Sequence, residues 1–193
     1  MEGPFAMNDH LWWYLSRSTG IVALFLLAGS MIWGVLLSTR ALREVDRPAW
    51  LNAMHTWLAG TGLVMTAVHV VSLIFDEWVA FGAGDILVPG VADWGGATTM
   101  NRVGTAVGVV SLYVMVIVQA TSYLRRHMSR RMWLAVHRLS YPLVFTVLAH
   151  AGWSGTDTSN RVYQVATLLL AMAIAAATVI RVITPARVRR AQV

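Results

Sequence analysis

The sequence predicts an all-α membrane protein, a bundle of five transmembrane helices with its N-terminus outside and its C-terminus inside the cell. The chain of 193 residues is 57% hydrophobic and only 12% charged, whereas a soluble domain carries about 25% charged residues. Its apolar residues form five runs, each as long as the roughly 17–25 residues that a helix needs to cross a bilayer. Its arginines gather on alternate connections between these runs. These three observations define the fold class.

The five runs are expected to be helices that together form one domain over residues 1–193. They lack the alternation of a strand, and only helices and closed barrels satisfy backbone groups in lipid. So much of the chain lies in apolar runs that it leaves no room for a soluble catalytic domain beside them. The expected spans are 18–39, 49–75, 103–124, 132–153 and 162–180.

The charged residues between the spans predict the orientation. Arginine-rich connections face the cytoplasm in multi-pass proteins. The net charge of +6 is therefore explained by topology in the cytoplasmic membrane, and binding of nucleic acid is not expected. Arginines follow the first, third and fifth spans, at Arg40, Arg43, Arg47, Arg125, Arg126, Arg130, Arg131, Arg181, Arg187, Arg189 and Arg190. Acidic residues mark the opposite side, at Glu2, Asp9, Asp76, Glu77, Asp85, Asp93 and Asp157.

The longest connection, Asp76–Asn101, is expected on the outer side. It is rich in glycine but also holds Trp78, Phe81 and Trp94. Long ordered loops are often functional. A floppy acidic loop is one interpretation, and the aromatic residues favour the other, a cap lying on the bundle at the membrane surface. Asp157, at the end of the next outer connection, is expected to cap the start of the fifth span.

Two histidine pairs lie inside the most apolar parts of the chain. Histidine in a bilayer is costly and usually functional. His55 and His69 are 14 residues apart in the second span, which places them about 21 Å apart on nearly the same helix face. Gly62 lies midway between them, and we expect it to leave room between two bulky ligands.

The second pair, His137 and His150, is 13 residues apart in the fourth span. On a straight helix this spacing would rotate the second ring by roughly 140° from the first. Pro142 lies between the two histidines, and proline kinks or rewinds a helix. We therefore expect Pro142 to return both rings to one face.

The topology pairs the histidines across two parallel helices. His55 and His137 are expected near the inner end, and His69 and His150 near the outer end. Each pair can supply both axial ligands of a haem b iron, and two haems at two depths would carry electrons across the membrane. The chain has no cysteine, which excludes iron–sulfur clusters, thioether-linked haem and disulfides.

Other functions remain open at this point. An intramembrane histidine can also bond a neighbouring helix or relay protons, so a haem-free proton-coupled transporter is one alternative. A metal transporter is another, although both would be expected to place acidic residues in the membrane, and none lies within the expected spans. A haem-bearing membrane anchor of an extracytoplasmic reductase is a third.

Several arginines are candidates for binding the cofactor. Arg17 and Arg102 lie at outer span ends, against the positive-inside pattern, and Arg138 adjoins His137. A guanidinium fits a carboxylate with two hydrogen bonds, so each is a candidate partner for a haem propionate; ordinary interfacial snorkelling is the alternative. The inner Arg125, Arg126, Arg130 and Arg131 are candidates for docking an anionic flavin or a reductase.

The two histidine spacings, H-x13-H and H-x12-H, resemble the ferric reductase-like transmembrane domain. The segments WWYLSRSTGIVA, RRMWLAVHRLSYPL and HAGWSGTDT are also similar to bacterial members. That domain is shared by ferric reductases, NADPH oxidases and the haem subunit of the periplasmic methionine sulfoxide reductase system. The resemblance implies that His55 and His137 bind the iron of an inner haem b, and His69 and His150 that of an outer one.

The resemblance also implies an oxidoreductase component that depends on a partner. Larger members of the family add a cytoplasmic flavin and nicotinamide domain, whereas this sequence stops soon after its fifth span. We therefore expect a separate donor, either a flavin reductase or quinol. The expected acceptor lies outside: a ferric chelate, oxygen, a quinone or an extracytoplasmic redox partner.

Overall fold

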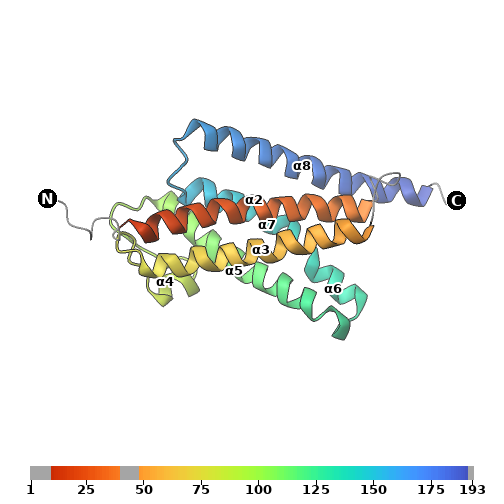
Figure 1. Cartoon of the computed structure of the whole chain (residues 1–193), viewed down its shortest axis with the longest axis horizontal. Helices are drawn as coiled ribbons and strands as arrows, with labels where there is room; N and C mark the ends of the chain where they lie inside the picture. The colour runs from red at the N-terminus through yellow and green to blue at the C-terminus, as the bar shows by residue number, and fades with distance from the viewer. Residues whose placement is uncertain (1–9, 40–47, 191–193) are drawn as a thin grey trace.

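A computed structural model describes residues 10–39 and 48–190, with backbone alone at 48 and 185–190. Within these ranges, five helices are long and apolar enough to span a membrane, as predicted. Figure 1 shows them running roughly along the long axis of the molecule. The elements in chain order are α2 (Leu11–Thr39), α3 (Pro48–Phe75), α4 (Ala83–Leu87), α5 (Thr99–Tyr123), the 3-10 turn η1 (Arg125–His127), α6 (Arg130–His137), α7 (Ser140–Ser154) and α8 (Arg161–Arg190).

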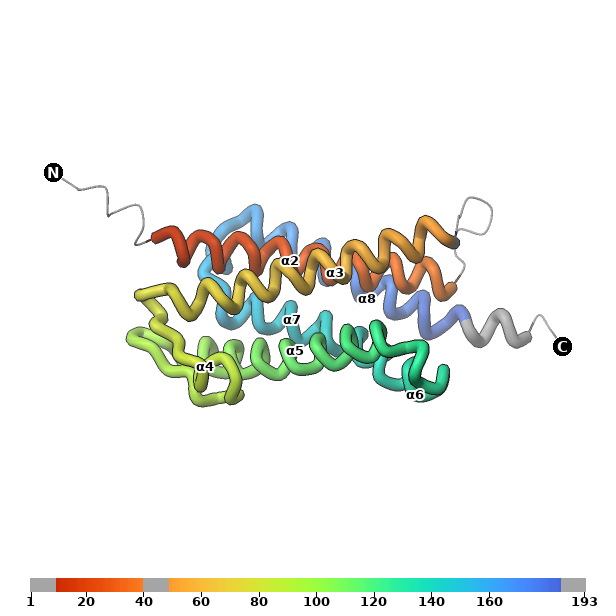
Figure 2. Tube along the Cα trace, turned by 60° about the horizontal axis from the view of Figure 1, so that its bottom comes forward, coloured from red at the N-terminus to blue at the C-terminus, as the bar shows by residue number. Residues whose placement is uncertain are grey.

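Two helix pairs form the framework. Helix α2 packs along α3, and α5 packs along α7, while α8 lies against α2. Figures 1 and 2 show α2 and α3 side by side, with α5 and α7 together below them in the turned view of Figure 2. The histidines of α3 therefore face those of the α6–α7 segment from opposite helix pairs.

A core of small and branched side chains holds α2, α7 and α8 together. Ala28 and Ile174 are completely buried there, and small residues let helix backbones approach closely in a membrane. The buried members are Ala28, Met31, Val35, Val144, Ile174 and Ala177. This core fixes α7 beside α2. Helix α2 carries the hydrogen-bond partners of two histidines.

The fourth span is broken between α6 and α7, as the predicted effect of Pro142 requires. Proline has no N–H and its ring clashes with the carbonyl four residues earlier, which here belongs to Arg138. That carbonyl instead accepts a bond of 3.1 Å from the N–H of Tyr141. The N–H of Leu139 likewise bonds to Val136, at 2.9 Å. These tighter turns change the rotation between His137 and His150.

The first helix begins earlier than expected. We predicted a span from residue 18, because Arg17 marked an end of the apolar run, but α2 starts at Leu11. The third helix also begins before the expected 103–124, as Thr99–Tyr123, and the fifth extends beyond 162–180 at both ends, as Arg161–Arg190. The added turn of α2 places Ser16 and Arg17 on a helix.

The outer connection forms an ordered cap. Asp76 is buried, and its carboxylate accepts the N–H groups of Trp78 and Val79 at 2.9 and 3.1 Å. Phe81, Ile86 and Ala92 form a buried cluster against Val70 and Leu73 of α3. The cap interpretation of Asp76–Asn101 is therefore supported over the floppy loop.

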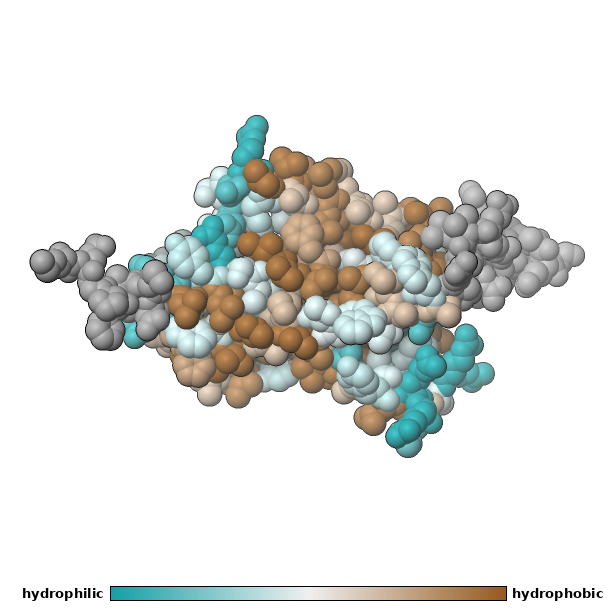
Figure 3. Space-filling view, in the orientation of Figure 1, coloured by the Kyte–Doolittle hydropathy of each residue, from teal (hydrophilic) through white to brown (hydrophobic). Residues whose placement is uncertain are grey.

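The surface is apolar over the middle of the molecule. Figure 3 shows apolar residues there and hydrophilic ones toward the ends, including the end where α6 lies. The exposed Arg125, Arg126, Arg130 and Arg131 belong to that end. Other residues used to predict orientation lie outside the described residues: Glu2, Asp9, Arg40, Arg43 and Arg47, and the side chains of Arg187, Arg189 and Arg190. The orientation stays a prediction.

Candidate functional site: two facing histidine pairs

The structure brings the four histidines together in the two predicted pairs. The ring centres of His55 and His137 are 6.0 Å apart, and the ring planes are inclined by 79°. The ring centres of His69 and His150 are 6.3 Å apart, with planes inclined by 71°. Two imidazoles on opposite sides of one metal ion, with bonds of about 2.0–2.1 Å, have ring centres roughly 6 Å apart. Both pairs therefore fit bis-histidine ligation.

Backbone carbonyls of neighbouring helices hold three of the four imidazoles. Nδ1 of His55 lies 2.8 Å from the carbonyl oxygen of Ser30, and Nδ1 of His69 lies 2.8 Å from that of Ser16. Nδ1 of His150 lies 2.9 Å from the carbonyl oxygen of Gly104. An Nδ1–H donated in this way fixes the tautomer and leaves Nε2 as the ligand nitrogen.

Serine hydroxyls add a second contact to the α3 histidines. The Oγ atoms of Ser16 and Ser30 lie 3.2 and 3.1 Å from Nδ1 of His69 and His55. The two serines are 14 residues apart on α2, the same spacing as the two histidines on α3. Because the helices pack side by side, one local arrangement is repeated at two depths.

Glycines make room for the rings. A Cβ on Gly20 would lie 3.0 Å from Nδ1 of His69, and one on Gly34 would lie 3.2 Å from Cε1 of His55. A Cβ on Gly108 would lie 2.5 Å from Nδ1 of His150. A Cβ on Gly62 would meet Cδ2 of Leu27 on α2 at 3.0 Å. Gly62 therefore permits close packing of α3 on α2, and its expected role between two ligands stays a prediction.

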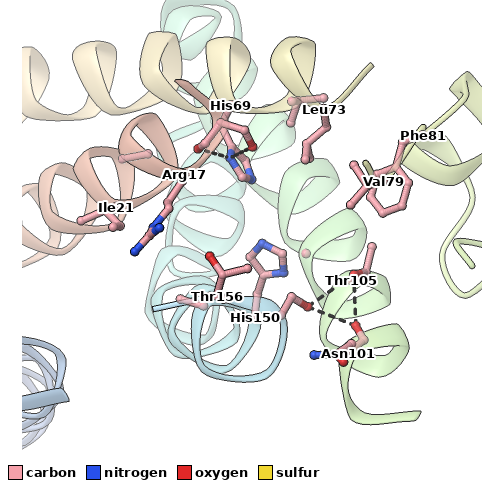
Figure 4. Close-up of a pocket in the computed structure, with 18 of the residues that line it drawn as sticks. Arg17, Ile21, His69, Leu73, Val79, Phe81, Asn101, Thr105, His150 and Thr156 are labelled. Carbon is pink, nitrogen blue, oxygen red and sulfur yellow. Dashed lines mark hydrogen bonds between the residues drawn. The ribbon is translucent and has the colours of Figure 1, made fainter. Parts of the chain in front are cut away.

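A cavity of about 560 Å³ surrounds the outer pair. Figure 4 shows His69 and His150 pointing into it from α3 and from α7, with Phe81 of the cap at its side. Its lining comes from α2, α3, the cap, α5, α7, the α7–α8 connection and α8. A volume of this size is ample for a large organic ligand, and the cap forms part of its wall.

The donor set suits a metal ion whose remaining ligands come from a macrocycle. Each site offers two imidazole nitrogens, and the described residues contain no cluster of three or more histidine, cysteine or acidic side chains suited to a metal. A bare ion would therefore lack most of its ligands, whereas a porphyrin supplies four nitrogens and needs two axial ones. The residues present fit two haems.

The structure places the three candidate arginines differently. Arg17 lines the outer cavity, but its guanidinium forms an ion pair with Asp157 and lies 4.7 Å from the ring centre of Trp13. Arg102 pairs with Asp93 at 2.8 Å on the surface. Arg138 is exposed at the break after α6. Contact of any of them with a haem propionate remains a prediction.

Asp157 has a different role from the one expected. The first N–H groups of α8 are capped by the side chain of Asn160, which accepts from Val162 and Tyr163 at 2.9 and 3.3 Å. The carboxylate of Asp157 faces Arg17 instead. The prediction that Asp157 caps the fifth span was therefore wrong, since the chain turns once more before the helix begins.

Fold and site together define a multi-pass helical membrane protein with two facing pairs of intramembrane histidines. The sequence profile described as Ferric reductase like transmembrane component matches residues 19–148, about two thirds of the chain. The chain therefore belongs to this family, which confirms the resemblance, and membrane electron transfer is the function that the family suggests. Searches of curated proteins and of solved structures find no match.

Sequence reasoning missed the residues that position the histidines. Ser16 and Gly20 recur as Ser30 and Gly34 in α2. This Ser-x3-Gly repeat, at the histidine spacing, was a visible signal once α2 was known to pack on α3. No comparable signal marks the carbonyl of Gly104, because a carbonyl belongs to every residue.

Proposed function

We propose that this protein holds two haems b and carries electrons across the cytoplasmic membrane. One observation carries the proposal. At each of two depths, two histidines from different helices face each other, with ring centres 6.0 and 6.3 Å apart. The chain has no cysteine to attach haem covalently, which excludes the c type. Haem, when bound, supplies reversible one-electron chemistry at its iron.

The chain's own residues favour electron transfer over binding of a gas. Two histidines at each site would hold the iron of a bound haem between them and would leave no position open for oxygen. Carbonyl partners at Nδ1 increase the basicity of the opposite nitrogen and hold the ring against rotation. Fixed ligands keep the site nearly unchanged between two oxidation states, as fast electron transfer requires.

The two sites are proposed to lie at different depths in the membrane. His55 and His69 are 14 residues apart on one helix, or about 21 Å by helical rise, in a hydrocarbon layer of about 30 Å. We propose that electrons enter at the His55–His137 site and leave from the His69–His150 site. Arg125, Arg126, Arg130 and Arg131 lie at the entry end, where a flavin reductase or another anionic donor is the proposed partner.

The outer cavity is the proposed exit. Its lining includes Trp94 of the cap and Thr156 of the α7–α8 connection as well as the outer histidines. We propose that the acceptor, a ferric chelate or another oxidant, reacts at this end. An extracytoplasmic redox protein would meet the same face, so the activity requires a partner or substrate at each end.

Haem stoichiometry tests the proposal. The chain purified in mild detergent should contain two haems and show a b-type α band in its reduced-minus-oxidised spectrum. Replacement of His55 or His137 by alanine should leave only the outer haem, and replacement of His69 or His150 only the inner one. His127, exposed and outside both pairs, provides the control His127→Ala. Absence of the band, or haem retained when all four histidines are alanine, would overturn the proposal.

Transfer across the membrane needs a separate measurement. In sealed vesicles containing the protein and an impermeant oxidant, an impermeant reductant added outside should reduce the enclosed oxidant. Vesicles with the His69→Ala variant should lose this reaction while the inner haem remains reducible. A di-haem protein that shows no transfer in vesicles would instead be an anchor for a partner enzyme.

A further inference from the structure

His137 is held differently from the other three histidines. Within the described residues, its Nδ1 has one hydrogen-bond contact, to the hydroxyl of Ser122 at 3.4 Å. That distance is beyond the usual 2.7–3.2 Å of such bonds. The other three imidazoles each have a carbonyl oxygen at 2.8 or 2.9 Å. Hydrogen bonding alone therefore leaves this ring poorly fixed.

An aromatic stack takes the place of the missing bond. The ring of Trp133 lies nearly parallel to that of His137, with centres 5.0 Å apart and planes inclined by 21°. Residues four apart on a helix lie on the same face, so α6 itself brings Trp133 onto His137. Stacked rings at this separation attract each other beyond simple burial.

A cation lies near the other ring of the stack. The guanidinium carbon of Arg125 is 5.2 Å from the centre of the Trp133 ring, within the range of a cation–π interaction. Arg125 comes from η1, just before α6 begins. The indole Nε1 of Trp133 is buried without a hydrogen-bond partner in the described part of the chain. Stacking is therefore the interaction that accounts for its position.

We infer that Trp133 is the positioning residue for His137, and that it fixes the imidazole plane of one inner ligand by stacking. The inference rests on the proposed function and adds to it an asymmetry between the two sites. Both outer ligands have carbonyl partners, whereas the inner site combines one carbonyl-bonded ligand with one stacked ligand. A ligand without a carbonyl partner differs in electron donation from one that has such a partner, so the two sites should differ in reduction potential.

Three variants of the full-length chain test the inference. Trp133→Leu removes the stack, and Trp133→Phe keeps an aromatic ring but removes the indole N–H. Trp57→Leu is the matched control, because Trp57 is 73% exposed and lies two residues from His55. The readouts are the low-spin signals in electron paramagnetic resonance, which depend on the angle between axial imidazole planes, and a redox titration that resolves the two haems.

Trp133→Leu should change the signal and the midpoint potential of one haem, and weaken retention of that haem by roughly 10- to 100-fold. The other haem serves as an internal reference and should not change. Trp133→Phe and Trp57→Leu should both resemble the wild type. His137→Ala, which removes the inner ligand itself, identifies which signal belongs to the inner site.

Two results would overturn the inference while leaving the proposed function intact. One is a Trp133→Leu variant with both haem signals unchanged. The other is a Trp133→Phe variant as impaired as Trp133→Leu, which would assign the effect to the indole N–H. A wild-type protein without two haems would instead overturn the proposed function. The two failures are therefore distinguishable.

Discussion

Gly108 of α5 lies directly against the imidazole of His150 on α7, so that a Cβ on Gly108 would fall 2.5 Å from Nδ1. Real Cβ atoms essentially never approach so closely, and the ring would have to move. Movement would break the contact of 2.9 Å between Nδ1 and the carbonyl of Gly104. The outer site therefore requires glycine at position 108.

Gly108→Ala should remove the outer haem and leave about one haem per chain, because the displaced imidazole can no longer face His69. Gly152→Ala is the control on α7, since a Cβ there would meet no other heavy atom within 4 Å in the described structure. Haem content per protein and the reduced-minus-oxidised spectrum provide the measurement. Full haem content in Gly108→Ala would contradict the proposed packing.

Pro142→Ala should lower haem content, because α6 and α7 could then join into one continuous helix. His137 and His150 would be rotated apart by roughly 140° on that helix. At most one of the two pairs could then form. Pro89→Ala, in an exposed part of the cap, is the control for loss of a proline. If Pro142→Ala keeps two haems, the break at Arg138 has another cause.

The ion pair between Arg17 and Asp157 should stabilise the outer end of the bundle, because it joins α2 to the connection before α8. The side chain of Asp157 is only 11% exposed, whereas that of Arg17 is 34% exposed. We expect a coupling energy of about 1–2 kcal/mol, which lies between the values for exposed and for buried ion pairs. Thermal unfolding in detergent of Arg17→Gln, Asp157→Asn and the double variant gives the coupling. Additive effects would show that the pair contributes nothing.

Phe81→Ala should loosen the cap over the outer cavity. Phe81 is 6% exposed and packs with Ile86 and Ala92, and removal of a buried phenylalanine side chain typically costs about 3–5 kcal/mol. Hydrogen exchange should become faster in the cap while the exchange of α2 stays unchanged. Leu87→Ala, at a position 53% exposed, should have little effect. Equal exchange in both variants would mean that the cap is held by other contacts.

The sequence alone determined the membrane class, the five helices and the two histidine pairs. These features depend on local composition or on helical spacing, and both of those properties are visible in the sequence. The 14-residue spacing of His55 and His69 and the proline between His137 and His150 were sufficient to predict which rings face each other. Asp157 was misassigned because its partner, Arg17, lies on another helix.

Only the tertiary structure decided what holds the histidines. Carbonyls of Ser16, Ser30 and Gly104 reach three of the rings because α2 packs on α3 and α5 packs on α7. The fourth, His137, stacks on Trp133 instead. Helical spacing predicts the face of a side chain, but its contacts depend on the depth, distance and rotation of the neighbouring helix. Those quantities are set by packing across the whole bundle.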